Sequence, residues 1–315
     1  MDFRIEFCRR LQPDTLRPQG LIRAENSHFQ VDEILGFDPS GEGEHLYFQI
    51  RKDGQNTAWV KQQMATQLGV EFLDIGHSGL KDRHAVTTQW LSVYTPSGEH
   101  HPDQIDIEGV EVLQIARHSH KLRPGTHRAN RFRILITEIS QPQGLDMLLE
   151  QISDQGFPNY FGEQRFGHDG NNLKNGWELL QKRKLRHHKK KSIYLSALRS
   201  FLFNQVLSAR IALGPERASS FDCTGPLWGR GRSPVNGPQC EFERGVLEPW
   251  LPLCDALEFS GLNQERRQLF QSVQDLAWSW PQKDQLLLDF SLPPGSFATA
   301  LLYELLNWSE ADTRV

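Results

Sequence analysis

The chain has 315 residues, of which 38% are apolar and 23% are charged, and its net charge is −4. This composition is typical of a globular protein with one large domain or two of ordinary size. It has no apolar run of membrane-spanning length and no signal-peptide pattern at its N-terminus, and its four widely spaced cysteines contain no Cys-x-x-Cys pair. We therefore expect a cytoplasmic protein without a disulfide framework or a zinc site.

The first 156 residues are rich in predicted strands. Alternating apolar and polar residues predict strands over 26–34 and 45–51, the second with Leu46, Phe48 and Ile50 on one face. A helix is predicted over 56–68, with Asn56 or Thr57 as its cap and Gly69 as its stop. Further strands are predicted over 89–94, 109–115 and 132–139, followed by a helix over 145–155.

The pattern changes at Phe157, where an aromatic, glycine-rich loop leads into a largely helical stretch. A helix is predicted over 192–213, and the Gly- and Pro-rich run 221–239 is predicted to be loop. A strand at 285–290 and a helix over 298–308 end the chain. We therefore predict an α/β (α+β) domain formed by 1–156 and 271–315, interrupted by an inserted domain over 157–270.

The run 78–90 contains the strongest candidate for chemistry. Asp82 lies between Lys81 and Arg83, shortly after Gly79 and just before a predicted strand. Loops on a rigid scaffold often carry chemistry, and neighbouring cations favour an ionised carboxylate. The local composition also fits a surface turn with an ion pair, so these residues alone make Asp82 only a candidate.

A basic run is present within the mildly acidic chain. Positions 182–191 contain seven Lys or Arg residues, a density suited to neutralising phosphates. A solvated charged face is the alternative interpretation. The candidate RNA-backbone contacts in this run are Lys182, Arg183, Lys189 and Lys190.

A second segment, 117–133, combines basic residues with histidines. His118, His120 and His127 have no carboxylate or thiolate at matching helical spacing, which argues against a metal site. Contact with RNA is the preferred interpretation, and Arg128 and Arg131 are the candidates for it.

Four separated segments, 79–87, 127–132, 159–167 and 292–299, together resemble the TruD family of tRNA pseudouridine synthases. The resemblance implies a pseudouridine-synthase-type catalytic domain around a mixed, mostly antiparallel sheet, interrupted by an inserted TRUD-type domain. It also implies a monomer that isomerises uridine 13 in the D arm of tRNA, without metal or cofactor.

The same resemblance suggests roles for single residues. Asp82 matches the essential carboxylate, Phe29 an aromatic against the target uridine, and Asn130 an amide that contacts it. Phe297 matches an aromatic that closes the pocket, and Phe132 stands where most other pseudouridine synthases have tyrosine. From pattern alone, Phe29 and Phe132 would be core residues.

Arg23 occupies a position where relatives carry a basic residue, often lysine. This difference leaves the cation that pairs with Asp82 open among Arg23, Lys81 and Arg83.

The implied reaction breaks the N1–C1′ bond and forms a C5–C1′ bond, so it needs neither a redox cofactor nor an energy source. A carboxylate can start it as a nucleophile on the sugar or as a base that removes a ribose proton. The sequence leaves both roles open. Two other classes are considered: a non-catalytic RNA-binding or RNA-folding protein, and a glycosylase that releases uracil.

Overall fold

The computed structural model describes residues 3, 10–11, 17–96, 105–182, 190–214 and 221–311. The chain forms two compact units. The sheet unit comprises Arg17–Ser153, Val273–Ala298 and Leu305–Val315. The helical unit comprises Asp154–Ser272, Thr299–Glu304 and the described part of Met1–Leu16. Within these described ranges, no helix is both long and apolar enough to span a bilayer.

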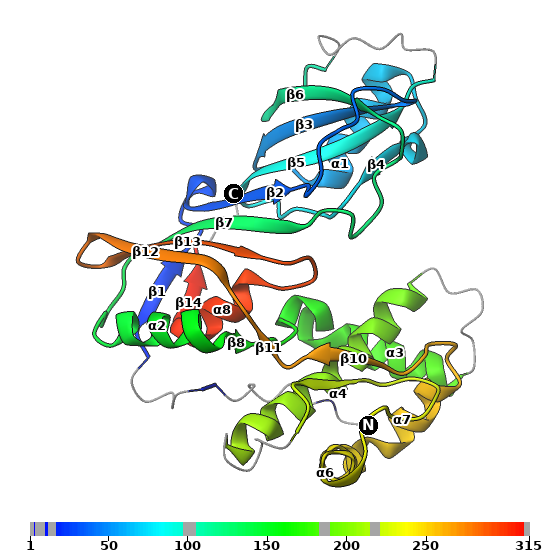
Figure 1. The fold of residues 1–315 in the computed structure, drawn as a ribbon, viewed down its shortest axis with the longest axis vertical. Coiled ribbons are helices and arrows are strands. Elements are labelled where there is room, and N and C mark those ends of the chain that lie inside the picture. Colours follow the sequence, from blue (N-terminus) through cyan, green and yellow to red (C-terminus); the bar gives the residue numbers. More distant parts are fainter. Residues whose placement is uncertain are drawn as a thin grey trace. The chain divides into compact units, whose positions relative to one another are not determined.

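The sheet unit is built on one eight-stranded sheet (Figure 1). Its strands lie in the order β12 (Gln274–Gln282), β13 (Gln285–Leu292), β7 (Ala129–Ile136), β2 (Phe29–Ile34), β5 (Val86–Tyr94), β3 (His45–Asp53) and β6 (Val110–His118), and β4 (Ile75–His77) pairs with β5. Only the β2–β5 pair is parallel among the described strands of this sheet. The predicted mixed, mostly antiparallel sheet is confirmed.

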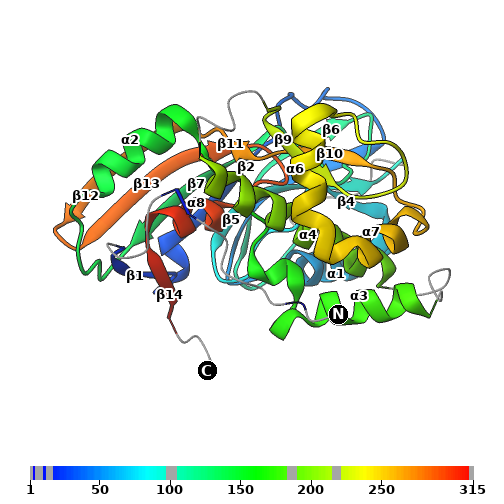
Figure 2. The ribbon, with the colours of Figure 1, turned by 90° about the horizontal axis from the view of Figure 1, so that it is seen from below.

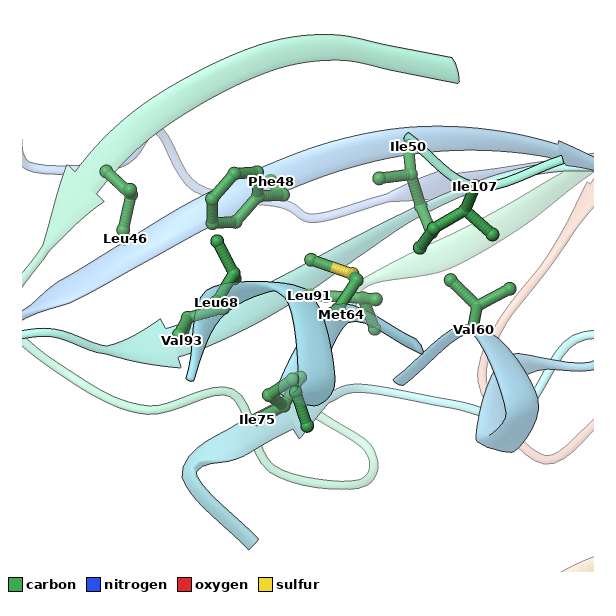
Figure 3. Packing of buried hydrophobic residues seen from close by; sticks show 11 residues of the cluster. Leu46, Phe48, Ile50, Val60, Met64, Leu68, Ile75, Leu91, Val93 and Ile107 are labelled. Carbon is green, nitrogen blue, oxygen red and sulfur yellow. The ribbon is translucent and has the colours of Figure 1, made fainter. Parts of the chain in front are cut away.

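Helix α1 (Thr57–Leu68) packs on this sheet as its sequence pattern predicts. The Asn56 side chain accepts hydrogen bonds from the backbone N–H groups of the first turn, and Gly69 ends the helix with φ +66°. The stripe Val60, Met64 and Leu68 is buried against apolar side chains of the sheet (Figure 3). These sheet residues include Leu46, Phe48, Ile50, Leu91 and Val93.

The edge strand β12 was not predicted. It pairs with β13 and lies beside helix α2 (Leu145–Gln155) (Figure 2). The indole N–H groups of Trp278 and Trp280 both donate to Asp146 Oδ1, at 2.8 and 3.0 Å. Leu276, Trp278 and Trp280 are half-buried and alternate with exposed residues, so the sequence did carry a strand pattern of period two here.

The predicted helix 298–308 is wrong at its end. Helix α8 stops at Leu305, and β14 (Asn307–Glu310) follows it. This strand pairs in parallel with β1 (Gln19–Ile22), which was also not predicted. A partner nearly 290 residues away in sequence, rather than local propensity, decides the conformation of these residues.

Besides residues Thr299–Glu304 of α8, the helical unit contains four helices and two short sheets among its described residues. The helices are α3 (Asn171–Gln181), α4 (Lys191–Leu213), α6 (Gly237–Leu247) and α7 (Leu251–Glu258). Strand β9 (Thr224–Leu227) pairs with β10 (Glu265–Gln268), and β8 (Phe157–Pro158) pairs with β11 (Phe270–Gln271). The predicted loop 221–239 is therefore wrong over β9, where the Gly-Pro pair weakened the strand pattern, and over its last three residues, where α6 begins at Gly237.

Candidate active site

Asp82 lies in the loop between β4 and β5, in an ion pair with Arg23. Arg23 Nη2 donates to Asp82 Oδ2 at 2.6 Å, and Nη1 donates to Glu310 Oε1 at 2.5 Å. The Arg23 side chain is 7% exposed, whereas that of Asp82 is 52% exposed. Of the three candidate cations, Arg23 makes the pair, and it leaves one side of the carboxylate open to solvent.

Arg23 is held from several sides. Its backbone has φ +55°, a left-handed conformation that costs a residue with a Cβ about 1 kcal/mol or more. Its guanidinium carbon lies 4.1 Å from the centre of the Phe29 ring, within cation–π range. Two carboxylates and one aromatic face thus stabilise a conformation that local preference disfavours.

Lys52 holds the backbone of the Asp82 loop. Its side chain is fully buried, and Nζ donates to the carbonyl oxygens of Asp82 and Gln55 at 2.7 and 2.6 Å. Burial lowers the pKa of Lys52 from 10.5 to about 8; the charge of Asp82 opposes this change and that of Lys81 adds to it. The sequence carried a signal for Lys52, since it continues the buried alternation of Leu46, Phe48 and Ile50.

Lys81 points into the protein and pairs with Glu33. Lys81 Nζ lies 3.0 Å from Glu33 Oε2, and both side chains are buried. Glu33 Oε1 also accepts from Ser78 Oγ at 2.7 Å and from the Trp90 backbone N–H at 3.1 Å. Glu33 is a second residue that the sequence interpretation missed, although it continues the buried alternation begun by Phe29 and Val31.

Asn130 joins the same network from strand β7. Its Oδ1 accepts from Lys81 Nζ at 2.8 Å, and its Nδ2 lies 3.1 Å from Nε2 of His127. Burial, followed by the charge of Lys81, lowers the pKa of His127. The structure therefore brings Asn130 and Lys81 into direct contact, with Asp82 as the next residue of the loop.

The two aromatic residues of β2 and β7 lie in the sheet core. Phe29 is 1% exposed, and its ring meets Phe132 edge-on at 6.3 Å between centres. Phe132 stacks on Phe290 at 5.3 Å. Phe297, by contrast, is half-buried at the turn that leads into α8, and its role against a ligand stays a prediction.

Comparisons with known proteins show the family of this chain. A family model described as TruD, tRNA pseudouridine synthase D, matches residues 11–186. A protein of that name from Cellvibrio japonicus is 41% identical over 326 residues, covering 100% of this chain and 96% of its own length. The chain belongs to the TruD family. A further member, from Aeromonas hydrophila, is 40% identical over 327 residues, covering 93% and 92% of the two chains.

The fold of the TruD family is also found in a solved structure. A crystal structure assigned by its description to tRNA pseudouridine synthase D from Methanosarcina mazei matches with a TM-score of 0.69. It covers 93% of this chain and 94% of its own, at 20% sequence identity. At this identity the match supports the fold alone.

The residues of this TruD-family chain that are predicted to contact the RNA backbone differ in their exposure and in their ion pairs. Arg128 and Lys190 are exposed, and Lys182 is exposed with its Nζ 3.0 Å from Glu178. Arg131 forms a bidentate pair with Asp289, at 2.8 and 2.9 Å, and these hydrogen bonds raise the pKa of Arg131. Arg183 and Lys189 lie outside the described residues, and the RNA contacts of all six stay predictions.

No metal site is evident where the structure can be described. Across those residues, no three His, Cys, Asp or Glu side chains come together as a metal ion would require.

Proposed function

We propose that this protein is a tRNA pseudouridine synthase that converts uridine 13 of the D arm to pseudouridine, with Asp82 as the catalytic carboxylate. Membership of the TruD family supports pseudouridine formation in tRNA. The observation that carries the assignment of Asp82 is its pairing with Arg23. One carboxylate oxygen is bound at 2.6 Å, while no described residue hydrogen-bonds Oδ1.

This geometry suits the start of glycosidic bond cleavage. Either a nucleophilic attack on C1′ or removal of a ribose proton requires a charged carboxylate with a free oxygen. Arg23 places a positive charge 2.6 Å from the carboxylate, and Lys52 keeps the backbone of Asp82 in place. Both roles of Asp82 remain within the proposal, which makes the protein an isomerase of the intramolecular-transferase type.

The target base must leave the folded tRNA to reach Asp82. Extrusion of a nucleotide costs a few kcal/mol, and stacking on an aromatic ring contributes about 1–3 kcal/mol per base. In this proposal Phe297 supplies such a ring. Phe29, which lies beneath Arg23 in the structure, supports the guanidinium that pairs with Asp82 and reaches the uridine only if that guanidinium moves aside.

The decisive experiment measures tritium release from tRNA labelled at uridine C5. Asp82→Asn should abolish release while tRNA binding stays within a few-fold of wild type, because the amide keeps the shape and loses the charge. Asp154→Asn, at an exposed position on α2, is the matched control and should release tritium normally. An active Asp82→Asn enzyme would refute the assignment of Asp82.

Product analysis separates the alternatives. Pseudouridine at nucleotide 13 of the recovered tRNA is the expected result, and a tRNA with cytidine at that position should give no release. Free uracil would identify a glycosylase. Salt-dependent binding without any modified nucleotide would identify an RNA-binding protein.

A further inference from the structure

Four side chains, among them that of Lys81, the residue before Asp82, form one continuous chain of contacts. It runs from Glu33 on β2 through Lys81 and Asn130 to His127, which lies two residues before β7. The three contacts measure 3.0, 2.8 and 3.1 Å. Glu33, Lys81 and His127 are buried, and Asn130, which lies between Lys81 and His127, is half-buried.

The direction of each hydrogen bond in this chain follows from chemistry. A lysine ammonium can only donate, so the Asn130 atom that faces Lys81 must be the oxygen. The amide nitrogen therefore faces His127 and donates, which requires Nε2 of His127 to be an unprotonated acceptor. The single proton of neutral His127 must then reside on Nδ1.

One hydrogen of the Asn130 amide is left over. Nδ2 carries two hydrogens, one of which is directed at His127, and no acceptor for the other is found in the described part of the chain. Because Oδ1 is already bonded to a cation, Nδ2 is the group that Asn130 can offer to a ligand. Its natural partner is a carbonyl oxygen, such as those of a uracil ring.

We propose that His127 is a positioning residue which, with Lys81, locks the Asn130 amide so that it donates an N–H to a carbonyl oxygen of the target uracil. This inference rests on the proposed function for its ligand. The lock itself rests on the contacts of this chain. Without His127, the Lys81 contact alone would hold the amide by its oxygen and leave its nitrogen free to turn.

The surroundings of His127 set the pH range in which this lock exists. Burial and the charge of Lys81 lower the pKa of His127, while Glu33 and the Ser78 backbone act in the opposite direction. Nδ1 is buried against the Ser78 backbone without a hydrogen bond of ordinary geometry. His127 is therefore neutral near pH 7. When the pH falls through a pKa below 6.5, protonated Nε2 faces the Asn130 donor and the contact is lost.

The test compares pH profiles of kcat/KM for tritium release between pH 5 and pH 8. His127→Gln places a non-titrating amide oxygen near the position of Nε2, and it should keep activity within about threefold while losing the acid limb. His127→Leu removes the acceptor and should lower kcat/KM about tenfold at every pH. His77→Gln is the matched control. His77 is half-buried and its Nδ1 lies 3.4 Å from Lys61 Nζ, and the variant should keep the wild-type pH profile.

A second measurement is independent of activity. The ¹⁵N chemical shifts of the histidine side chains should show His127 as the Nδ1–H tautomer in wild type. In the Asn130→Asp variant this tautomer should be lost, because a carboxylate cannot donate to Nε2. A protonated Nε2 in neutral wild-type protein would overturn the lock. So would a His127→Leu enzyme with wild-type kcat/KM. If wild type forms no pseudouridine while His127 shows the expected tautomer, the proposed function fails and the lock stands.

Discussion

Lys52 offers a quantitative test of how the Asp82 loop is held. The Lys52→Met variant keeps most of the buried apolar stem and removes the ammonium group with its two hydrogen bonds. Burial lowers the pKa of Lys52 from 10.5 to about 8, so the folded protein releases this proton at a lower pH than the unfolded chain does. The unfolding free energy of wild type must therefore rise with pH between these two values.

The size of that rise follows from the two pKa values. One pKa unit corresponds to 1.36 kcal/mol, so the difference between 10.5 and about 8 amounts to about 3 kcal/mol. Below pH 8 the lysine is charged in both states and its burial destabilises the fold by the full amount. Above pH 10.5 it is neutral in both states and the penalty is gone.

Urea unfolding of wild type and Lys52→Met at pH 7.5 and pH 10 measures this effect. The difference in unfolding free energy between the two proteins should shift by about 2–3 kcal/mol in favour of wild type at the higher pH. Other titrating groups are common to both proteins and cancel. Lys182→Met, at an exposed lysine, should show no such shift. A Lys52 difference that stays constant within about 1 kcal/mol would refute the reasoning.

Three further predictions test the supporting contacts. Arg23→Lys keeps a charge but replaces two guanidinium nitrogens, one on Asp82 and one on Glu310, by a single ammonium nitrogen, so kcat/KM should fall about tenfold with tRNA binding nearly unchanged; an unaffected rate would show that the two-armed contact is dispensable. Glu33→Gln leaves the buried ammonium of Lys81 without its counter-charge and should lower the unfolding free energy by about 3–5 kcal/mol in urea; a loss below 1 kcal/mol would contradict the pairing. Gly76→Ala should destabilise by about 1–3 kcal/mol, because its Cβ would lie 2.4 Å from a backbone carbonyl oxygen. Gly245→Ala, in a helix with open space around it, should instead stabilise by about 0.5–1 kcal/mol, and equal effects at the two glycines would show that packing does not decide the outcome.

The amino-acid sequence alone determined the elements whose information is local. Helix α1 could be predicted from its Asn56 cap, its apolar stripe and its Gly69 stop, because each signal acts within a few residues. The strands β2 and β3 could be predicted in the same way, since apolar residues at every second position indicate which face of a strand is buried. The Asp82 loop stood out because its residue types are unusual in combination.

Only the tertiary structure decided which distant groups meet. Three cations were candidates for the partner of Asp82, and the choice of Arg23 depends on a pairing of β1 with β14 that brings Glu310 to the other side of the guanidinium. Lys52 was visible as a lysine on a buried face, but its acceptors lie on loops whose position no local pattern encodes. The periodicity of a segment specifies which of its faces is buried, whereas a hydrogen bond between two segments depends on where folding places both partners. For this reason the site could be located in the sequence, but its contacts could not be predicted.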